Sequence, residues 1–180
     1  MENQGTATGQ KPGMLTGLFN DKESSESAYK SLRDRGYSDD DINVMMSDDT
    51  RKKYYANDTD SELGSKAAEG TGVGGAIGGT LGAIIAGIAA IGTNLVLPGV
   101  GLVVWGPLAA ALAGAGAGGL TGGLVGALVG SGIPEDRAVA YEAGIKNGGT
   151  VLGVTPRSNE DATTLENEWK TNHRGEHVYR

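Results

Sequence analysis

The chain has 180 residues, so we expect one domain, with or without an insertion. Its formal net charge is −7 and both ends are acidic, which excludes the basic footprint of a nucleic-acid-binding protein. It has no cysteine, which excludes disulfides and cysteine metal sites, and residues 1–13 form a polar, flexible N-terminus without the apolar core of a secretion signal.

The first ordered part of the chain is a β-α-β unit over residues 14–46. Asn20 or Asp21 can cap its helix, and Gly36 can end that helix in the left-handed conformation. The second strand shows the alternation of apolar residues that is typical of β-structure. The predicted elements are a strand over 14–19, a helix over 21–35 and a strand over 42–46.

A polar linker over 47–69, with one short helix near Arg51–Tyr55, leads into a long stretch without charge. No charged residue occurs between Glu69 and Glu135. Pro98 and Pro107 exclude one unbroken helix across it. The predicted elements are a hydrophobic helical hairpin over 70–132, with helices over about 70–92 and 107–131 and an apolar connection over 93–106.

Glycine recurs at every fourth position within this stretch, in two ladders. Four-residue spacing places each ladder on one face of a helix, where the absence of side chains lets another helix approach closely. Each interior glycine costs ~1 kcal/mol of helix stability relative to alanine, so close packing or a membrane must offset the loss. The predicted packing residues are Gly70, Gly74, Gly78, Gly82, Gly114, Gly118, Gly122, Gly126 and Gly130.

The hairpin is long enough to cross a bilayer. A helix over 70–92 would be ~34 Å long, and the hydrocarbon core of a bilayer is ~30 Å thick. However, glycine and alanine contribute little apolar area, and basic anchors beside the stretch are sparse. The alternative is that the hairpin packs inside an oligomer without entering lipid.

The chain after the hairpin completes the α/β domain over residues 133–156. Pro134 can occupy the first position of a helix over 134–147, and Thr150–Thr155 forms a third strand that Pro156 ends. Residues 157–180 are polar, and we expect a disordered tail with a weak helix near Trp169. The predicted fold class is therefore α+β, with a small three-stranded sheet covered by the helices over 21–35 and 134–147.

Several segments in this order resemble the bacterial general stress and low-temperature-induced proteins. They are Gly17–Phe19, Gly36–Ile42, Pro98–Gly101, Gly106–Leu112, Gly132–Asp136 and Gly148–Leu152, within a match over about 14–155. The resemblance implies a ferredoxin-like α/β half-domain interrupted by a glycine-zipper hairpin, and expression under stress. It brings no catalytic residues.

Three other motifs are weak. His173–His177 fits the H-x-x-E-H zinc pattern, but Gly175 interrupts it and no third histidine exists. The G-x-G-x-x-G matches at 70–75 and 114–119 lack the strand before and the acidic residue after that a dinucleotide site needs. The acidic run at 39–41 lacks the spacing of a calcium loop, so turn and capping roles are expected.

The sequence therefore predicts a non-enzymatic bacterial stress-response protein without cofactor, metal or catalytic residues. Its expected partners are copies of itself and, through residues 70–132, a lipid bilayer, with no nucleic acid. Its expected location is the bacterial cytoplasm, at the cytoplasmic face of the inner membrane or inserted in it. The alternative is a soluble oligomeric binding or regulatory module whose hairpins pack against each other.

Overall fold

The computed structural model describes residues 12–55, 63, 94–97, 101–114, 123–130 and 132–180. Its strands are β1 (Leu15–Phe19), β2 (Ile42–Ser47), β3 (Asn94–Leu97), β4 (Leu102–Trp105), β5 (Thr150–Val154) and β6 (Glu176–Tyr179). Its helices are α1 (Lys22–Asp34), α2 (Asp48–Tyr54), α6 (Pro107–Gly114), α8 (Gly123–Gly130), α9 (Glu135–Lys146) and α10 (Asn159–Thr171). This mixture of helices and strands confirms the α+β class.

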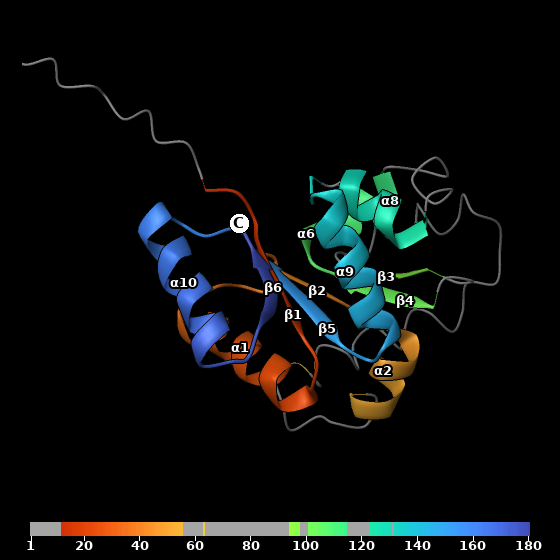
Figure 1. The fold of residues 1–180 in the computed structure, drawn as a ribbon, viewed down its shortest axis with the longest axis horizontal. Coiled ribbons are helices and arrows are strands. Elements are labelled where there is room, and N and C mark those ends of the chain that lie inside the picture. The colour runs from red at the N-terminus through yellow and green to blue at the C-terminus, as the bar shows by residue number, and fades with distance from the viewer. Residues whose placement is uncertain (1–11, 56–62, 64–93, 98–100, 115–122, 131) are drawn as a thin grey trace, which may run out of the picture.

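The strands form one sheet in the order β3-β4-β2-β5-β1-β6, and every neighbouring pair is antiparallel. Helices lie on both sides of it, with α1 and α10 on one side and α6, α8 and α9 on the other (Figure 1). The central strands β1, β2 and β5 are buried on both faces. A sheet covered on both faces explains why these strands are apolar nearly throughout.

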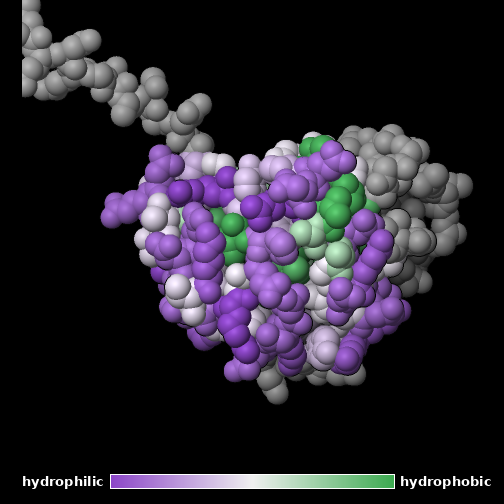
Figure 2. All heavy atoms as spheres, viewed as in Figure 1, coloured by the Kyte–Doolittle hydropathy of each residue, from purple (hydrophilic) through white to green (hydrophobic). Residues whose placement is uncertain are grey.

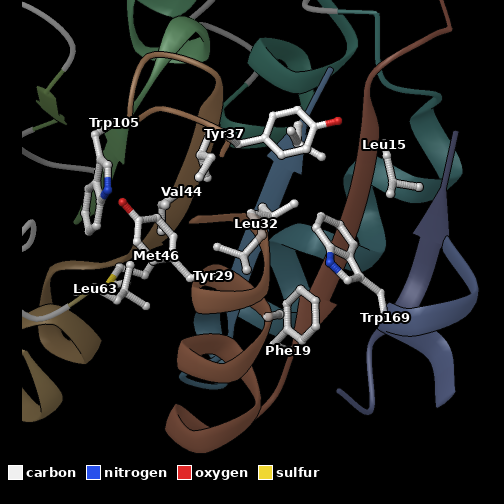
Figure 3. Packing of buried hydrophobic residues seen from close by; sticks show 14 of the residues in the cluster. Leu15, Phe19, Tyr29, Leu32, Tyr37, Val44, Met46, Leu63, Trp105 and Trp169 are labelled. Atoms are coloured by element: carbon white, nitrogen blue, oxygen red, sulfur yellow. The ribbon is translucent and has the colours of Figure 1, made fainter. Parts of the chain in front are cut away.

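The core under α1 and α10 takes alternate side chains from the strands. Leu15 and Phe19 of β1 point to this side, and the Phe19 ring meets the Trp169 ring of α10 edge-on with centroids 5.4 Å apart. Tyr29 and Leu32 of α1 fill the space beside them (Figure 3). Residues of the first helix and of the last helix therefore share one core.

The second core lies under α6, α8 and α9, and it uses the other side chains of the strands. Leu18 of β1 and Met45 of β2 point to this side. Gly144 of α9 sits so close to Leu18 that a Cβ there would collide with the leucine side chain. The uncharged block therefore supplies much of one layer of the domain, with Leu102, Val104, Leu108, Ala109, Leu112, Leu124 and Leu128.

The predicted capping signals operate as the sequence suggests. The Asp21 carboxylate accepts a hydrogen bond of 2.8 Å from the Ser24 amide at the start of α1. Gly36 adopts a φ of 82° after the helix, a value that glycine reaches without steric cost. The predicted strands over 14–19, 42–46 and 150–155, the helices over 21–35 and 134–147, and the short helix near Arg51 are confirmed.

The prediction of a three-stranded sheet is wrong, because the sheet has six strands. Two of the additional strands, β3 and β4, lie within the stretch predicted as an apolar connection over 93–106 and form a β-hairpin at the edge of the sheet. This stretch is apolar at nearly every position, so its apolar residues recur with neither the period of a helix nor that of a strand. The sequence pattern therefore does not reveal the two strands. Pairing of β4 with β2 decides its conformation.

The prediction that residues 157–180 form a disordered tail is also wrong. They form α10 and β6, and β6 pairs with β1 at the second edge of the sheet. Ala162, Leu165 and Trp169 are fully buried on one face of α10. The other faces of α10 lie in water, which explains why the segment is polar. Ala162, Leu165 and Trp169 attach it to the core.

The predicted hairpin is described only in part. The first helix, over 70–92, lies outside the described residues. The second, over 107–131, is represented by α6 and α8, with 115–122 between them also outside. Both described pieces contribute to the second core, α6 against the strands β2, β3 and β4, and α8 against the helix α9. The Asn43 side chain of β2 accepts a hydrogen bond of 2.6 Å from the Leu108 amide, which fixes the start of α6.

Candidate functional site

The structure places only part of the predicted glycine ladders. The first ladder, Gly70 to Gly82, and two members of the second, Gly118 and Gly122, lie outside the described residues. Gly114 is the last residue of α6, and Gly126 and Gly130 belong to α8. The end of the second ladder is therefore the part whose surroundings are described.

The two faces of α8 differ in kind. Leu124 and Leu128 are buried in the second core, with exposed fractions of 5% and 0%. Gly126 follows Leu124 by two residues, which is about 200° of helix rotation, so the glycines lie nearly opposite the leucines. Gly126 is half-buried and Gly130 is exposed. A leucine face thus holds α8 in the second core, where α8 packs against α9, and the glycines lie on the other side of the helix.

Nothing described packs closely against the end of this glycine face. A Cβ at Gly130 would have no atom within 4 Å. The neighbouring Val129 is 41% exposed, and Val139 of the adjacent helix α9 is 51% exposed. These two are the exposed large apolar side chains of the described residues, and hydrophobic side chains gather over this end of the molecule (Figure 2). We call Val125, Gly126, Val129, Gly130 and Val139 the α8–α9 surface.

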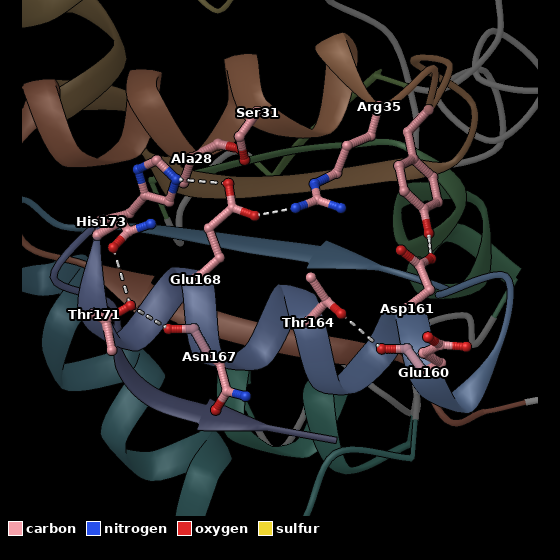
Figure 4. Close-up of polar contacts among 12 residues, drawn as sticks. Ala28, Ser31, Arg35, Glu160, Asp161, Thr164, Asn167, Glu168, Thr171 and His173 are labelled. Atoms are coloured by element: carbon pink, nitrogen blue, oxygen red, sulfur yellow. Dashed lines mark hydrogen bonds and ion pairs between the residues drawn. The ribbon is translucent and has the colours of Figure 1, made fainter.

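A chain of polar contacts joins α1 to the end of α10 (Figure 4). Ser27 Oγ lies 2.9 Å from His173 Nδ1, and His173 Nε2 lies 3.2 Å from Glu168 Oε1. The other oxygen of Glu168 accepts a hydrogen bond from the Arg35 guanidinium. Burial alone would raise the pKa of Glu168, but the contacts with His173 and Arg35 outweigh it and hold the pKa below its ordinary value.

Ser27, His173 and Glu168 are connected in the order serine, histidine, carboxylate, which is also the order of a nucleophilic catalytic triad. The surroundings of Ser27 decide whether these residues act as a triad or as a structural link. Ser27 lies in the middle of α1, and its hydroxyl borders no described cavity. A triad needs room for a substrate and donors for an oxyanion beside the nucleophile. Ser27 is not among the residues that line the described cavity, and we assign these contacts the role of a link between two helices.

The H-x-x-E-H segment does not form a helix. His173 lies in the turn after α10, and His177 lies in β6 with a φ of 48°. The two imidazoles therefore do not share the single helix face that the zinc pattern requires. The described residues contain no group of three histidine, aspartate or glutamate side chains arranged to hold a metal ion.

An open cavity of about 590 Å³ lies beside the start of β1 and the end of β6. Its lining combines Met14, Ile133 and Tyr179 with the polar residues Asn159, Thr163 and Arg180. The Arg180 guanidinium already donates a hydrogen bond of 2.9 Å to the Thr163 hydroxyl. Because this charged group is paired within the protein, the cavity does not indicate a particular ligand.

Sequence reasoning missed the polar link because its acidic and imidazole members lie in the segment predicted as disordered. Two signals in that segment indicate a helix. Ser158 caps α10 by accepting a hydrogen bond of 3.1 Å from the Asp161 amide, which is the pattern of serine followed three residues later by an acidic residue. Ala162, Leu165 and Trp169 follow at helical spacing.

Comparisons with known proteins returned no match, whether with protein-family models, with curated proteins or with solved structures. Among the described residues, no helix combines the length and the apolar character that crossing a membrane requires.

Proposed function

We propose that this protein is a non-enzymatic bacterial stress-response protein that self-assembles and associates with the membrane through its uncharged insert. The observation that carries the proposal is the division of α8 into a buried leucine face and an outward glycine face. Since a Cβ at Gly130 would meet no described atom within 4 Å, this end of the face is available to a second helix or to lipid.

The proposal includes a ferredoxin-like domain as the scaffold. Without the whole segment between β2 and β5, which contains α2 and α9 as well as the uncharged insert, the elements follow the order β1-α1-β2-β5-α10-β6, with the strands arranged as β2-β5-β1-β6. That is the β-α-β-β-α-β order of ferredoxin-like domains, with both helices on one side of the sheet. The insert between β2 and β5 then adds a β-hairpin to the sheet and a helical layer to its second side.

The second candidate function is a soluble oligomeric binding or regulatory module that assembles without lipid. It is favoured by the packing of α6 and α8 in the domain core, because leucines buried in that core are not free to enter a bilayer. Both functions use the α8–α9 surface, and both place the protein in the bacterial cytoplasm. They differ in whether the surface meets lipid at the cytoplasmic face of the inner membrane.

The test is a substitution on the glycine face, measured with the full chain. We expect Gly130→Leu to leave the monomer fold intact, because a Cβ at this position meets no described atom within 4 Å. We expect it to weaken self-association at least tenfold in sedimentation analysis, which corresponds to ~1.4 kcal/mol. Glu160→Leu, on the exposed side of α10, is the matched control and should assemble like the original protein.

Flotation with vesicles of bacterial lipid separates the two candidates. Recovery of the original protein with the vesicles supports membrane association. Recovery as a defined oligomer apart from the vesicles supports the second candidate. Equal assembly of Gly130→Leu and the original protein would contradict a role for the glycine face. Deletion of 70–132 is unsuitable, because it would remove β3, β4, α6 and α8 from the fold.

A further inference from the structure

The helices α9 and α10 carry the same arrangement of charge on their exposed faces. In α10, Glu160 of the first turn and Lys170 of the last turn are ten positions apart, and both are exposed. In α9, Asp136 and Lys146 have the same spacing and are also exposed. Acidic residues at the start of a helix and basic residues at its end interact favourably with the helix dipole, so these charges alone require no partner.

The residues between the charges differ in the two helices. Thr163 and Asn167 of α10 are exposed and polar, so this face is suited to water. The corresponding residues of α9 are Val139 and Ala143, which are also exposed, and Val139 is one of the exposed large apolar side chains of the described residues. Hydrophobic side chains lie in the open at this end of the molecule, with hydrophilic ones around them (Figure 2). α9 therefore presents an apolar centre between two charged ends.

These four residues of α9 form one line along the helix, and we call Asp136, Val139, Ala143 and Lys146 the α9 seam. They follow one another at intervals of three, four and three residues, which is the spacing of the contact line of a coiled coil. The opposite face of α9 is buried in the second core. The seam therefore lies on the side of the helix that is turned away from the core.

The α9 seam is complementary to itself. When two copies of α9 lie antiparallel about a two-fold axis, Asp136 of one copy faces Lys146 of the other, and Val139 faces Ala143. Both ends of the contact then join opposite charges, and the small side chain of Ala143 leaves room for Val139. A contact with an unrelated partner does not require this symmetry of charge and size about the middle of the helix. The symmetry selects a second copy as the partner.

The charged ends of the seam have contacts within the chain, but they remain accessible. Lys146 Nζ lies 2.9 Å from Glu142 Oε1, and Asp136 Oδ2 lies 3.5 Å from Arg137 Nε. The side chains of Lys146 and Asp136 are nonetheless 71% and 76% exposed, so each can take a second partner. Charge pairs of this kind set the register and the orientation of a contact more than its strength.

We infer that two copies of this chain associate through an antiparallel pair of α9 helices, with their α9 seams in contact. The inference rests on the self-association of the proposed function and gives it a defined geometry. Val139 belongs to the α8–α9 surface, so the seam identifies which part of that surface meets the second copy. One short helix from each copy gives a small contact, so we expect a weak dimer.

The test reverses the charge at one end of the seam at a time. Asp136→Lys and Lys146→Asp each place like charges at both ends of the two-fold contact, so each variant alone should dimerise at least tenfold more weakly in sedimentation analysis. Mixed in equal amounts, the two variants should form a heterodimer of the original strength, because every lysine then faces an aspartate. Glu160→Lys and Lys170→Asp are the matched controls. They make the same changes of charge at the same spacing on α10 and should dimerise like the original protein.

Thermal unfolding at low concentration checks that the four variants fold. Dimerisation of Asp136→Lys or of Lys146→Asp at the original strength would overturn the inference. A mixture of the two folded variants that stays monomeric would overturn it as well, because contact with another segment of the chain or with lipid gains nothing from a copy of opposite charge.

A disulfide tests the same contact without altering its charges, since the chain has no cysteine. Copies of Val139→Cys mixed with copies of Ala143→Cys should form a crosslinked dimer under mild oxidation. Thr163→Cys mixed with Asn167→Cys, at the corresponding positions of α10, is the control and should crosslink more slowly. Equal rates of crosslinking in the two mixtures would contradict the pairing of α9, whatever the stability of the charge variants.

Three combinations of results separate this inference from the proposed function. If Gly130→Leu blocks assembly and Asp136→Lys dimerises like the original protein, the inference fails and the proposed function stands. If the mixture restores dimerisation and Gly130→Leu assembles like the original protein, the inference stands and the role of the glycine face fails. If the original protein is monomeric at every concentration and does not bind vesicles, both fail.

Discussion

Tyr37, in the loop after α1, donates its phenolic hydrogen to the Asp161 carboxylate in the first turn of α10. The Arg157 guanidinium lies over the Tyr37 ring, 4.3 Å from its centroid, and donates to the Arg35 carbonyl at 3.0 Å. These contacts join two segments that are more than a hundred residues apart in the sequence, at the opposite end of α10 from His173. The last helix is therefore fixed to the first at both of its ends.

Tyr37 gives the fold a dependence on alkaline pH. Burial and the hydrogen bond to Asp161 raise the pKa of Tyr37 from 10.0 to about 12. Because the pKa of Tyr37 is higher in the folded state, the protonated phenol contributes to the free energy of unfolding. This contribution is complete below pH 10 and is lost as the pH rises toward 12. In urea unfolding across this range, Tyr37→Phe should lose less stability with pH than the original protein, by about 2 kcal/mol at most.

Burial also raises the pKa of Tyr55 and Tyr141. The free energy of unfolding of Tyr37→Phe should therefore still fall with alkaline pH, but less steeply than that of the original protein. Tyr54→Phe, at a partly exposed position, is the control and should follow the original protein. The same dependence on pH in Tyr37→Phe and in the original protein would show that the contact with Asp161 does not hold the proton.

Glu168 gives the fold a dependence on acidic pH. Its pKa is lowered in the folded state, because the contacts with His173 and Arg35 outweigh the effect of burial. A lowered pKa contributes stability above the unfolded value, and this contribution is lost as the pH falls through the folded pKa. Glu168→Gln should therefore be less stable than the original protein at neutral pH, by ~1–2 kcal/mol, and the difference should shrink on acidification.

The measurement is the free energy of unfolding in urea at a series of acidic pH values. Glu176→Gln is the control, because Glu176 is exposed on β6 and has no ion pair among the described residues. A loss in Glu168→Gln that stays constant with pH would mean that the carboxylate acts through its shape and not through its charge.

Trp169 tests whether the end of the chain belongs to the core. Its side chain is fully buried, and its ring fills the space over Gly17, where a Cβ would lie 2.9 Å from it. Trp169→Ala should cost ~3–5 kcal/mol in the free energy of unfolding, which is typical of a buried aromatic residue. Val139→Ala, at an exposed site on α9, should change stability by less than ~0.5 kcal/mol. Equal, small losses in both variants would place residues 157–180 outside the cooperative fold.

The difference between the two ends of the chain shows which parts of a fold a sequence reveals. The β-α-β unit was predictable because its signals are local: Asp21 caps α1, Gly36 ends it, and the strands alternate. α10 has comparable signals in Ser158 and Trp169, but its many charged residues resemble those of a disordered segment. Its stability comes from contacts with β1 and α1, which are distant in sequence.

The uncharged block shows the opposite difficulty. Its glycine spacing and apolar character predicted helices that pack closely through glycine, whereas α8 packs in the second core, against α9, through Leu124 and Leu128. The sequence does not reveal that β3 and β4 extend the sheet, because an apolar run without periodicity is compatible with a strand or with a buried helix. The strand that pairs with β4 is β2, and the paired residues, from Ser47 with Leu102 to Val44 with Trp105, are about sixty positions apart in the sequence.

The two turns around β4 allow the cost of backbone conformation to be separated from the cost of crowding. Gly101 and Gly106 both adopt positive φ values, 64° and 94°. A Cβ at Gly101 meets nothing within 4 Å, whereas a Cβ at Gly106 would collide with the Ile42 carbonyl and lie 2.8 Å from Asn43 Cα. Gly106 must therefore be glycine for a second reason, since it leads β4 into α6 directly over β2.

Gly101→Ala should cost ~1 kcal/mol, the strain of a left-handed alanine. Gly106→Ala should cost roughly 2–4 kcal/mol, because overpacking against the β2 backbone adds to that strain. Urea unfolding followed by tryptophan fluorescence measures both, and Trp105 lies beside the substituted site. The Gly106 variant should also loosen the contact of Asn43 with the Leu108 amide, which shifts α6. If the two variants lose similar amounts of unfolding free energy, then β2 moves to accommodate the added methyl group. Gly106 would in that case not be closely packed against the β2 backbone.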